Sequence, residues 1–195
     1  MELNNEQKII KMLFKDFKTH YNSRSISKVI GISHAGAFKI MKKLEKKEMI
    51  LPEQIGRAVI YSLNFNNPLV LREVEMALTI EAWNYKRWTE EFKGLENISH
   101  FTILFGSIIV NEKSARDIDI LVVAEKSNFS RVREIIEERN KLSNKKIHLI
   151  LQNPDEFKKD AEHGNKVISD MIKKGIVLFG QNNLVKILKN DTNEK

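Results

Sequence analysis

The sequence contains no cysteine and no long apolar run. Without cysteine, the chain can form neither a disulfide bond nor a thiolate zinc site. A helix that spans a membrane needs about eighteen consecutive apolar residues, and no such run exists. The first residues, MELNNEQKIIKMLF, also lack the apolar segment and cleavage site of a signal peptide. These absences predict a cytoplasmic protein without a membrane partner.

The composition is that of a globular protein, with 42% hydrophobic and 30% charged residues among 195. This length suits one large or two small domains. The net charge of +7 is unevenly spread: residues 1–65 hold 12 Lys and Arg against 6 Asp and Glu, whereas residues 66–195 hold 21 against 20. The excess in the first third indicates a module that faces nucleic acid, joined to a nearly neutral one.

Two short helices joined by a glycine turn are predicted after a first helix at residues 5–18. Ser25 is placed to cap the first of the two, and Gly31 ends it, as glycine often does past a helix C-terminus. Ser33 caps the second helix. Spacings of three predict that this second helix buries three apolar side chains: Phe38, Met41 and Leu44.

Two helices joined by a short turn, the second one basic, are typical of a helix-turn-helix, in which the first turns of the second helix enter the major groove. Two short strands follow at residues 49–51 and 58–63. The turn between them, at residues 54–57, places Arg57 at the tip of a wing. The residues predicted to contact DNA are Ser33, His34, Lys39, Lys42, Lys43 and Arg57.

Residues 6–64 resemble the winged-helix DNA-binding domains of bacterial and archaeal regulators, including the Gly-Arg-Ala-x-x-Tyr-x-Leu-Asn ending of the wing. The resemblance implies double-stranded DNA as a partner. Winged helices also serve as protein-interaction or dimerisation modules, and the basic charge favours DNA.

A helix without internal glycine is predicted at residues 68–93, opened by Pro68. It carries apolar side chains on more than one side, which indicates burial between partners. One interpretation is a connecting helix that mediates a homodimer, matching a DNA reader on a two-fold site. The other is a helix packed only against its own two domains.

The second half is organised around the stretch from Phe101 to Val123. An apolar strand, residues 101–105, is followed by a Gly-Ser corner and a second strand that begins with Asp117 and Asp119. Side chains two apart on a strand share a face, so both carboxylates project together. Paired like charges beside a core favour a positive partner between them, such as a divalent metal carrying a triphosphate. Alternatively, the two aspartates cap a strand end in water.

The Gly106-Ser107 pair, the nine-residue gap and the run Asp117-Ile118-Asp119-Ile120-Leu121-Val122-Val123 resemble the signature of the minimal nucleotidyltransferases, in the superfamily with the DNA polymerase beta type of palm. The resemblance implies that Asp117 and Asp119 hold Mg²⁺ (or Mn²⁺) and that Gly106 and Ser107 contact the phosphates of a nucleoside triphosphate. It also implies a small mixed sheet covered by helices on one side. Further strands are expected at residues 145–151 and 176–179, and helices at 129–142, 155–174 and 184–188.

The chain departs from that family at three places. Active members carry a third carboxylate, as metal ligand and base, where this chain has His148. A neutral histidine is a base but a poor ligand for Mg²⁺, which prefers oxygen. Arg116 replaces a common serine, and is placed either to neutralise the carboxylates, to touch a phosphate, or to face solvent. The loop at residues 108–115 lacks the second glycine and the basic residue common there.

The sequence therefore predicts an α+β chain with a winged helix at residues 1–65, a connecting helix at 66–94 and a mixed-sheet domain at 95–190. The favoured function is a DNA-binding regulator whose second domain binds Mg-nucleotide with little or no turnover. The alternatives are an active nucleotidyltransferase that modifies a protein or small-molecule acceptor, with Asp117, Asp119 and His148 as catalytic residues, and a non-catalytic interaction scaffold.

Overall fold

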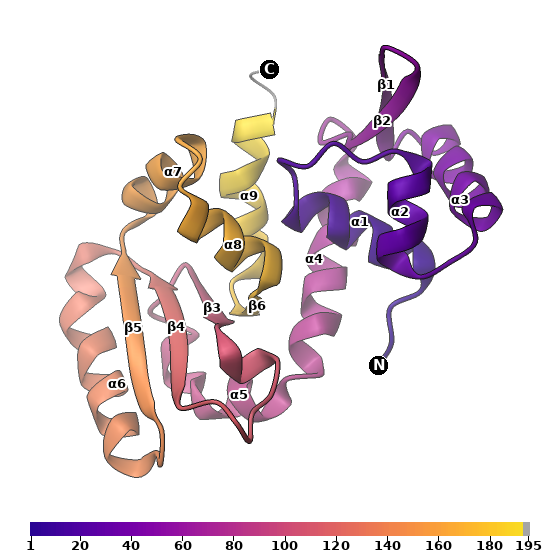
Figure 1. Ribbon diagram of the computed structural model, residues 1–195. Coiled ribbons are helices and arrows are strands. Elements are labelled where there is room, and N and C mark those ends of the chain that lie inside the picture. Colours follow the sequence, from indigo (N-terminus) through magenta and orange to yellow (C-terminus); the bar gives the residue numbers. More distant parts are fainter. Residues whose placement is uncertain (193–195) are drawn as a thin grey trace. The chain divides into compact units, whose positions relative to one another are not determined.

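The computed structural model describes residues 1–192 and confirms an α+β fold. The chain divides into two compact units, and the division falls between Ile80 and Glu81. Each unit has its own sheet, of two and four strands respectively (Figure 1). Within residues 1–192, no helix is both long and apolar enough to cross a membrane. The domain limits predicted from the sequence stay predictions.

The first unit begins with three helices: α1 (Asn5–Lys15), α2 (Ser23–Ile30) and α3 (His34–Lys46). The predicted cap of α2 was wrong, because Asn22 and not Ser25 is the N-cap. The Asn22 side chain accepts the Ser25 N–H at 2.9 Å, and the Ser25 hydroxyl accepts the Asn22 N–H at 2.9 Å. Gly31 ends α2 in the left-handed region, with φ 78°. The cap by Ser33 is confirmed, since its hydroxyl accepts the Gly36 N–H at 3.1 Å.

The wing is an antiparallel hairpin of β1 (Ile50–Ile55) and β2 (Ala58–Leu63). Ile55 pairs with Ala58, so the turn consists of Gly56 and Arg57. Gly56 has φ 60°, which a two-residue hairpin turn commonly demands. The first strand runs four residues beyond the predicted 49–51, and most of that extension is exposed.

The connecting helix is not continuous, contrary to the prediction for residues 68–93. It consists of α4 (Pro68–Trp83), α5 (Lys86–Glu91) and a 3-10 turn, η1 (Lys93–Leu95). The Tyr85 N–H donates to the Ala82 carbonyl at 2.8 Å, which closes a turn instead of another α-helical step. This break redirects the chain so that three apolar side chains enter the core of the second unit: Trp88, Phe92 and Leu95.

The second unit is built on a mixed sheet with strand order β5-β4-β3-β6. Its strands are β3 (Phe101–Phe105), β4 (Asp117–Val123), β5 (Lys146–Gln152) and β6 (Ile176–Phe179). β4 and β5 are parallel and joined through α6 (Phe129–Leu142), whereas β3 pairs antiparallel with β4 and β6. The expected helix at 155–174 is instead two helices, because Gly164 adopts φ 72° and Asn165 caps a new start. These are α7 (Pro154–Glu162) and α8 (Lys166–Lys174), and α9 (Gln181–Thr192) follows β6.

Helices cover both faces of this sheet, so the expectation of cover on one side was wrong. On one face, Ile118 and Ile120 of β4 share a core with α5 and α6. On the other face, Phe101 packs edge-on against Phe157 of α7, with ring centroids 4.8 Å apart. Figure 1 shows α6 beside β5, and α8 and α9 near β3 and β6. The start of β4 stays partly exposed on this second face, and both aspartates lie there.

Gly180, in the second unit, has a backbone conformation that leaves no room for a side chain. Its φ is +72°, and a Cβ would lie 1.9 Å from the His100 carbonyl oxygen. We expect Gly180→Ala to lower the free energy of unfolding by about 2 kcal/mol or more, measured by urea denaturation. Gly94→Ala is the matched control, because its Cβ would meet only the Ile135 side chain at 3.5 Å. Equal denaturation midpoints for the two variants would contradict this assignment.

Candidate functional site

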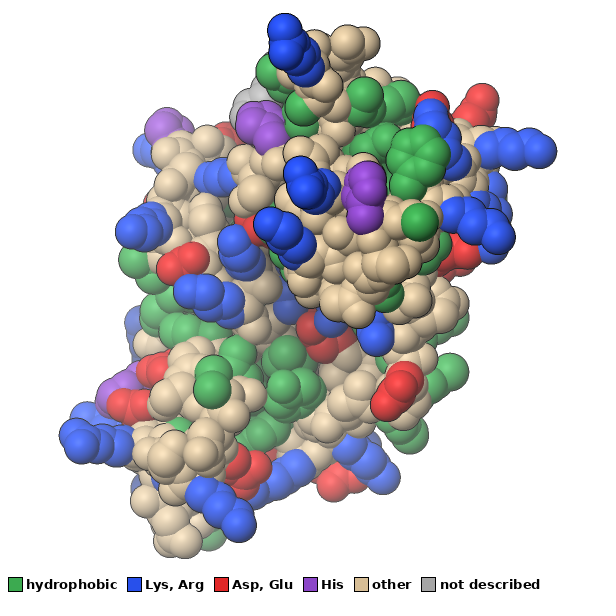
Figure 2. Space-filling model, turned by 45° about the vertical axis from the view of Figure 1, so that its right-hand side comes forward, with side chains coloured by type: hydrophobic (Ala, Val, Ile, Leu, Met, Phe, Trp, Pro, Cys, Tyr) green, Lys and Arg blue, Asp and Glu red, His purple; other side chains and the backbone are tan. Residues whose placement is uncertain are grey.

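The outward surface of α3 is basic. Ala37, Met41 and Leu44 are fully buried, and the opposite side of the helix carries lysines. Three of them are exposed and lie on one side at spacings of three and four: Lys39, Lys42 and Lys46. In Figure 2, lysine and arginine side chains lie on the upper part of the surface, with histidine and apolar side chains among them. Lys39, Lys42 and Lys46 thus form a basic stripe along one side of α3, which we call the α3 stripe.

Phe38 is not in the core, contrary to the prediction. Its side chain is 48% exposed, and the Lys42 ammonium lies 5.9 Å from its ring centroid. Ala37 takes the buried position instead, because spacings of four and three (37, 41, 44) describe a helix face as well as spacings of three do. The sequence pattern alone could not separate these two faces. Phe38 thus adds an apolar group beside the α3 stripe.

The remaining residues predicted to contact DNA lie at the start of α3 and at the wing tip. Ser33 and His34 are exposed, although the Ser33 hydroxyl is engaged in its cap. The His34 Nε2 lies 3.1 Å from the Ser23 hydroxyl, which ties the start of α3 to the start of α2. Arg57 is exposed at the hairpin turn, as predicted.

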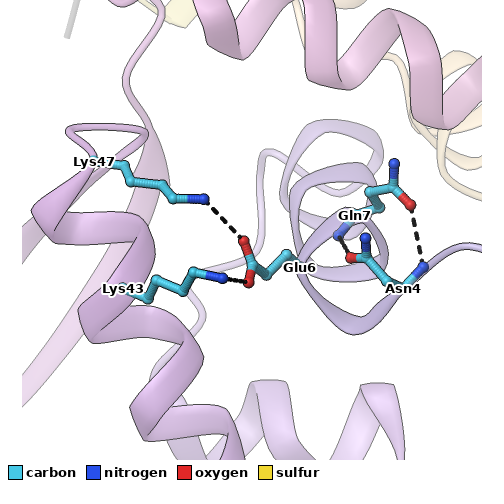
Figure 3. A network of polar contacts seen from close by, with 5 residues as sticks. All are labelled: Asn4, Glu6, Gln7, Lys43 and Lys47. Atoms are coloured by element: carbon cyan, nitrogen blue, oxygen red, sulfur yellow. Dashed lines mark hydrogen bonds and ion pairs between the residues drawn. The ribbon is translucent and has the colours of Figure 1, made fainter.

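Lys43 lies on the flank of α3 that faces α1. It pairs with Glu6, and Lys47 approaches the same carboxylate at 3.3 Å (Figure 3). The Lys43 hydrogen bond is the main reason that the pKa of Glu6 is lowered. Lys43 must therefore leave an ion pair before it can contact a phosphate, whereas Lys39 has no ion pair among residues 1–189, whose side chains are described.

The second candidate site is a cluster formed by β4 and β5. The parallel register places Asp119 opposite His148. The His148 Nδ1 lies 3.5 Å from Asp117 Oδ2 and 3.4 Å from Asp119 Oδ1. One potential ligand atom from each of the three residues lies within 4.8 Å of the others. His148 therefore faces the two aspartates, at the position where the resemblance places a third carboxylate.

The electrostatics of the cluster favour an added positive charge. The pKa of Asp119 is raised, first by burial and then by the neighbouring charge of Asp117, while His148 acts in the opposite direction. A carboxylate that is partly buried beside a like charge is destabilised unless a cation comes close. A cation placed between the two aspartates would supply that charge.

Gly106 provides the space that Asp119 occupies. Phe105 pairs with Asp119 across β3 and β4, so the next residue lies beside the carboxylate. Gly106 has φ 80° and ψ −161°, a region that essentially only glycine adopts, and a Cβ there would lie 2.0 Å from Asp119 Oδ2. Ser107 is exposed and starts a 3-10 turn, η2 (Ser107–Ile109). The Gly-Ser corner therefore lies directly beside the carboxylate of Asp119 in the fold.

Two basic residues flank the cluster, and sequence reasoning identified one of them. Arg116 is exposed and pairs with neither carboxylate within the described part of the chain. Lys146 was missed. It is the parallel partner of Asp117 and shares its face of the sheet, exposed, with His148 two residues on. Strand alternation from His148 was the signal that could have found it.

The donor atoms of the cluster fit a divalent cation. Asp117 and Asp119 offer carboxylate oxygens, the ligands that Mg²⁺ and Mn²⁺ take in proteins. Their side chains are 34% and 25% exposed, so an ion bound there keeps access to solvent or to a phosphate oxygen. His148 adds a nitrogen donor in place of a third oxygen.

No family model matches the chain, and no curated protein matches it. Among solved structures, it is similar to MepR, a transcription regulator of the Staphylococcus aureus multidrug efflux pump MepA. The identity is 13% and the TM-score 0.37, over 72% of this chain and 79% of that one. It is also similar to Lactococcus lactis ZitR, a zinc-responsive MarR family member, with 21% identity and a TM-score of 0.35. That match covers 46% of this chain and 63% of ZitR.

ZitR in complex with DNA gives 24% identity and a TM-score of 0.35, over 46% of this chain and 62% of that one. The chain thus covers less than two thirds of ZitR. TM-scores this low establish neither a family nor a function for the chain, so its function must follow from its own residues.

The paired carboxylates are expected to lower stability in the absence of a cation. We predict that Asp119→Asn raises the urea midpoint in the presence of a chelator, because it removes a partly buried charge beside Asp117. The matched control is Asp170→Asn, which removes an exposed charge 3.6 Å from Lys174 and should change the free energy of unfolding by less than about 1 kcal/mol. A lower midpoint for Asp119→Asn than for wild type would show that the carboxylate stabilises the fold.

Proposed function

We propose that the chain is a DNA-binding transcription regulator whose second unit binds a divalent cation with a nucleotide. The observation that carries DNA binding is the α3 stripe, which lies opposite the buried side of a helix-turn-helix. A helix of this kind fits the major groove, and exposed lysines on it contact phosphates. The wing adds Arg57, placed for a phosphate or the minor groove.

Within this interface, we assign different roles to charged and uncharged side chains. Lys39, Lys42 and Arg57 contact the DNA backbone, which sets affinity and salt dependence. Phe38, exposed beside the lysines of the α3 stripe, contacts the methyl group of a thymine, a common apolar contact in the major groove. Lys43 is paired with Glu6 and therefore contributes less to DNA binding than Lys39 does.

The second unit binds the nucleotide through the cluster of Asp117, Asp119 and His148. The cation neutralises the phosphates and is held by the two carboxylates, while the Gly106-Ser107 corner lies beside them. Turnover is low or absent because the position for a third carboxylate carries His148. Its Nδ1 faces the two aspartates at 3.4 and 3.5 Å, and a base held in this way is not directed at an acceptor hydroxyl.

The homodimer expected from the sequence stays a prediction. In the first unit, α4 exposes Leu69 and Met76, which are 62% and 52% exposed and seven residues apart on one side of the helix. An apolar strip of this kind suits a second copy of the chain, since two-fold partners present the same surface to each other.

DNA binding is tested by removing two lysines of the α3 stripe. We expect Lys39→Ala/Lys42→Ala to weaken duplex binding about tenfold or more at low salt and to reduce the slope of log K against log salt by about two. The control Lys158→Ala/Lys174→Ala removes two lysines of the second unit whose side chains are 44% and 66% exposed, and it should leave the slope unchanged. Lys43→Ala should reduce the slope less than Lys39→Ala does. An unchanged slope for the first variant would remove α3 from the interface.

Nucleotide binding is tested by calorimetry with Mg²⁺ and each nucleoside triphosphate. We expect Asp117→Asn/Asp119→Asn to abolish binding, because the cation then has no carboxylate ligands, and Asp170→Asn to retain it. Incubation with α-labelled triphosphates and a cell lysate as acceptor source should transfer no label. Transfer by wild type that disappears in the double variant would instead establish an active nucleotidyltransferase.

A further inference from the structure

The nitrogen of His148 changes which cation suits the cluster. We propose that Asp117, Asp119 and His148 bind one divalent transition-metal ion directly, of the class Mn²⁺, Co²⁺ or Zn²⁺, in preference to Mg²⁺ and without a nucleotide. This inference deepens the proposed function of the second unit and rests on the same site. It makes His148 a metal ligand and not only a replacement for a lost base.

The distances in the cluster match a shared ion. Bonds from Zn²⁺ to histidine nitrogen and carboxylate oxygen are about 2.0–2.2 Å long, so two tetrahedral ligand atoms lie about 3.4 Å apart. The His148 Nδ1 is 3.5 Å from Asp117 Oδ2 and 3.4 Å from Asp119 Oδ1. These two separations are too long for good hydrogen bonds and fit ligand atoms that face a common centre. The set of three atoms spans at most 4.8 Å.

The donor chemistry decides between classes of cation. Mg²⁺ takes oxygen ligands in a nearly octahedral arrangement, keeps several waters and does not favour nitrogen. Imidazole suits Zn²⁺ and neighbouring transition metals, while carboxylates also accept Mn²⁺. Two aspartate oxygens with one histidine nitrogen therefore favour a transition metal, and His148 is the residue responsible.

The surroundings of the cluster fix the position of one carboxylate and leave the cluster open to solvent. Gly106 adopts a conformation restricted to glycine, and this leaves the space that Asp119 Oδ2 needs. The His148 side chain is 48% exposed, so an ion held by the three residues would be reachable from solvent. A metal held by three protein ligands with one open position takes water or a phosphate oxygen as its fourth ligand. A nucleotide can then join an ion that is already bound.

One competing arrangement has the same geometry. A protonated His148 that pairs with both aspartates supplies the positive charge itself and leaves no need for a metal. A metal ligand and an internal counter-ion differ in how replacement of the His148 side chain changes cation binding. An internal counter-ion blocks cations and its removal improves their binding, whereas a ligand is required for binding.

The experiment is a titration of the full chain with Co²⁺, without nucleotide, followed by visible absorption and by competition with Zn²⁺, Mn²⁺ and Mg²⁺. We expect wild type to develop ligand-field absorption that Zn²⁺ displaces and Mg²⁺ does not. His148→Ala should weaken Co²⁺ binding at least about tenfold. His148→Asp should lose the preference for transition metals over Mg²⁺ and bind Mg²⁺ more tightly than wild type does. His163→Ala is the matched control, because His163 is an exposed histidine of the same unit. This variant should bind Co²⁺ as tightly as wild type does.

The proposal is overturned if wild type shows no Co²⁺ absorption, or if His148→Ala binds Co²⁺ as well as or better than wild type. Circular dichroism of each variant checks that the unit is folded. Calorimetry with Mg-nucleotide on the same preparations separates the two proposals. Nucleotide binding without any effect of His148 on Co²⁺ rejects only the transition-metal site. Absence of both rejects the nucleotide function of the second unit as well.

Discussion

The parallel pairing of β4 with β5 is the constraint on which the second unit depends. It places Asp119 opposite His148, and Lys146 opposite Asp117. Apolar side chains hold this register from the other face, where Ile118 and Ile147 are buried beneath α6. A slip by one residue would move His148 to that apolar face and expose its neighbours. The polar cluster is therefore positioned by hydrophobic burial on the opposite side of the sheet.

The antiparallel pairing of β3 with β4 completes the cluster. Because Phe105 pairs with Asp119, the backbone of Gly106 passes close to the carboxylate. A glycine is needed there for space, whatever ligand the site takes. This contact explains why the Gly106-Ser107 corner and Asp119, on the next strand, occur together in the sequence motif. The spacing in the sequence reflects a contact across two strands.

Charge in the first unit is partly neutralised within the unit itself. Lys43 and Lys47 converge on Glu6, and Lys42 pairs with Glu45 at 2.8 Å. Exposed pairs of this kind are weak, so DNA phosphates can compete for the lysines. Lys39 has no acidic partner among the side chains of residues 1–189. The net charge of residues 1–65 therefore overstates the number of basic side chains that can bind DNA without first leaving an ion pair.

Local signals were sufficient for most of the elements and for several of their ends. The strand at 101–105, the glycine that ends α2, the Ser33 cap and the wing tip at Arg57 follow from residue types over a few positions, because capping and turn preferences act locally. The orientation of the two aspartates toward one face also follows from strand alternation alone.

Features that depend on contacts between residues far apart in the chain could be determined only from the tertiary structure. Burial of Trp88 and Phe92 accompanies a break after α4 that no glycine or proline marks, and packing of Phe101 on Phe157 covers a face expected to be open. The exposure of Phe38 and the place of Lys146 also depend on which neighbours fill the core and on strand register. The sequence by itself determined the chemical groups and their local geometry. Only the tertiary structure brought His148 to the two aspartates, because strand register is set by burial between segments far apart in the chain.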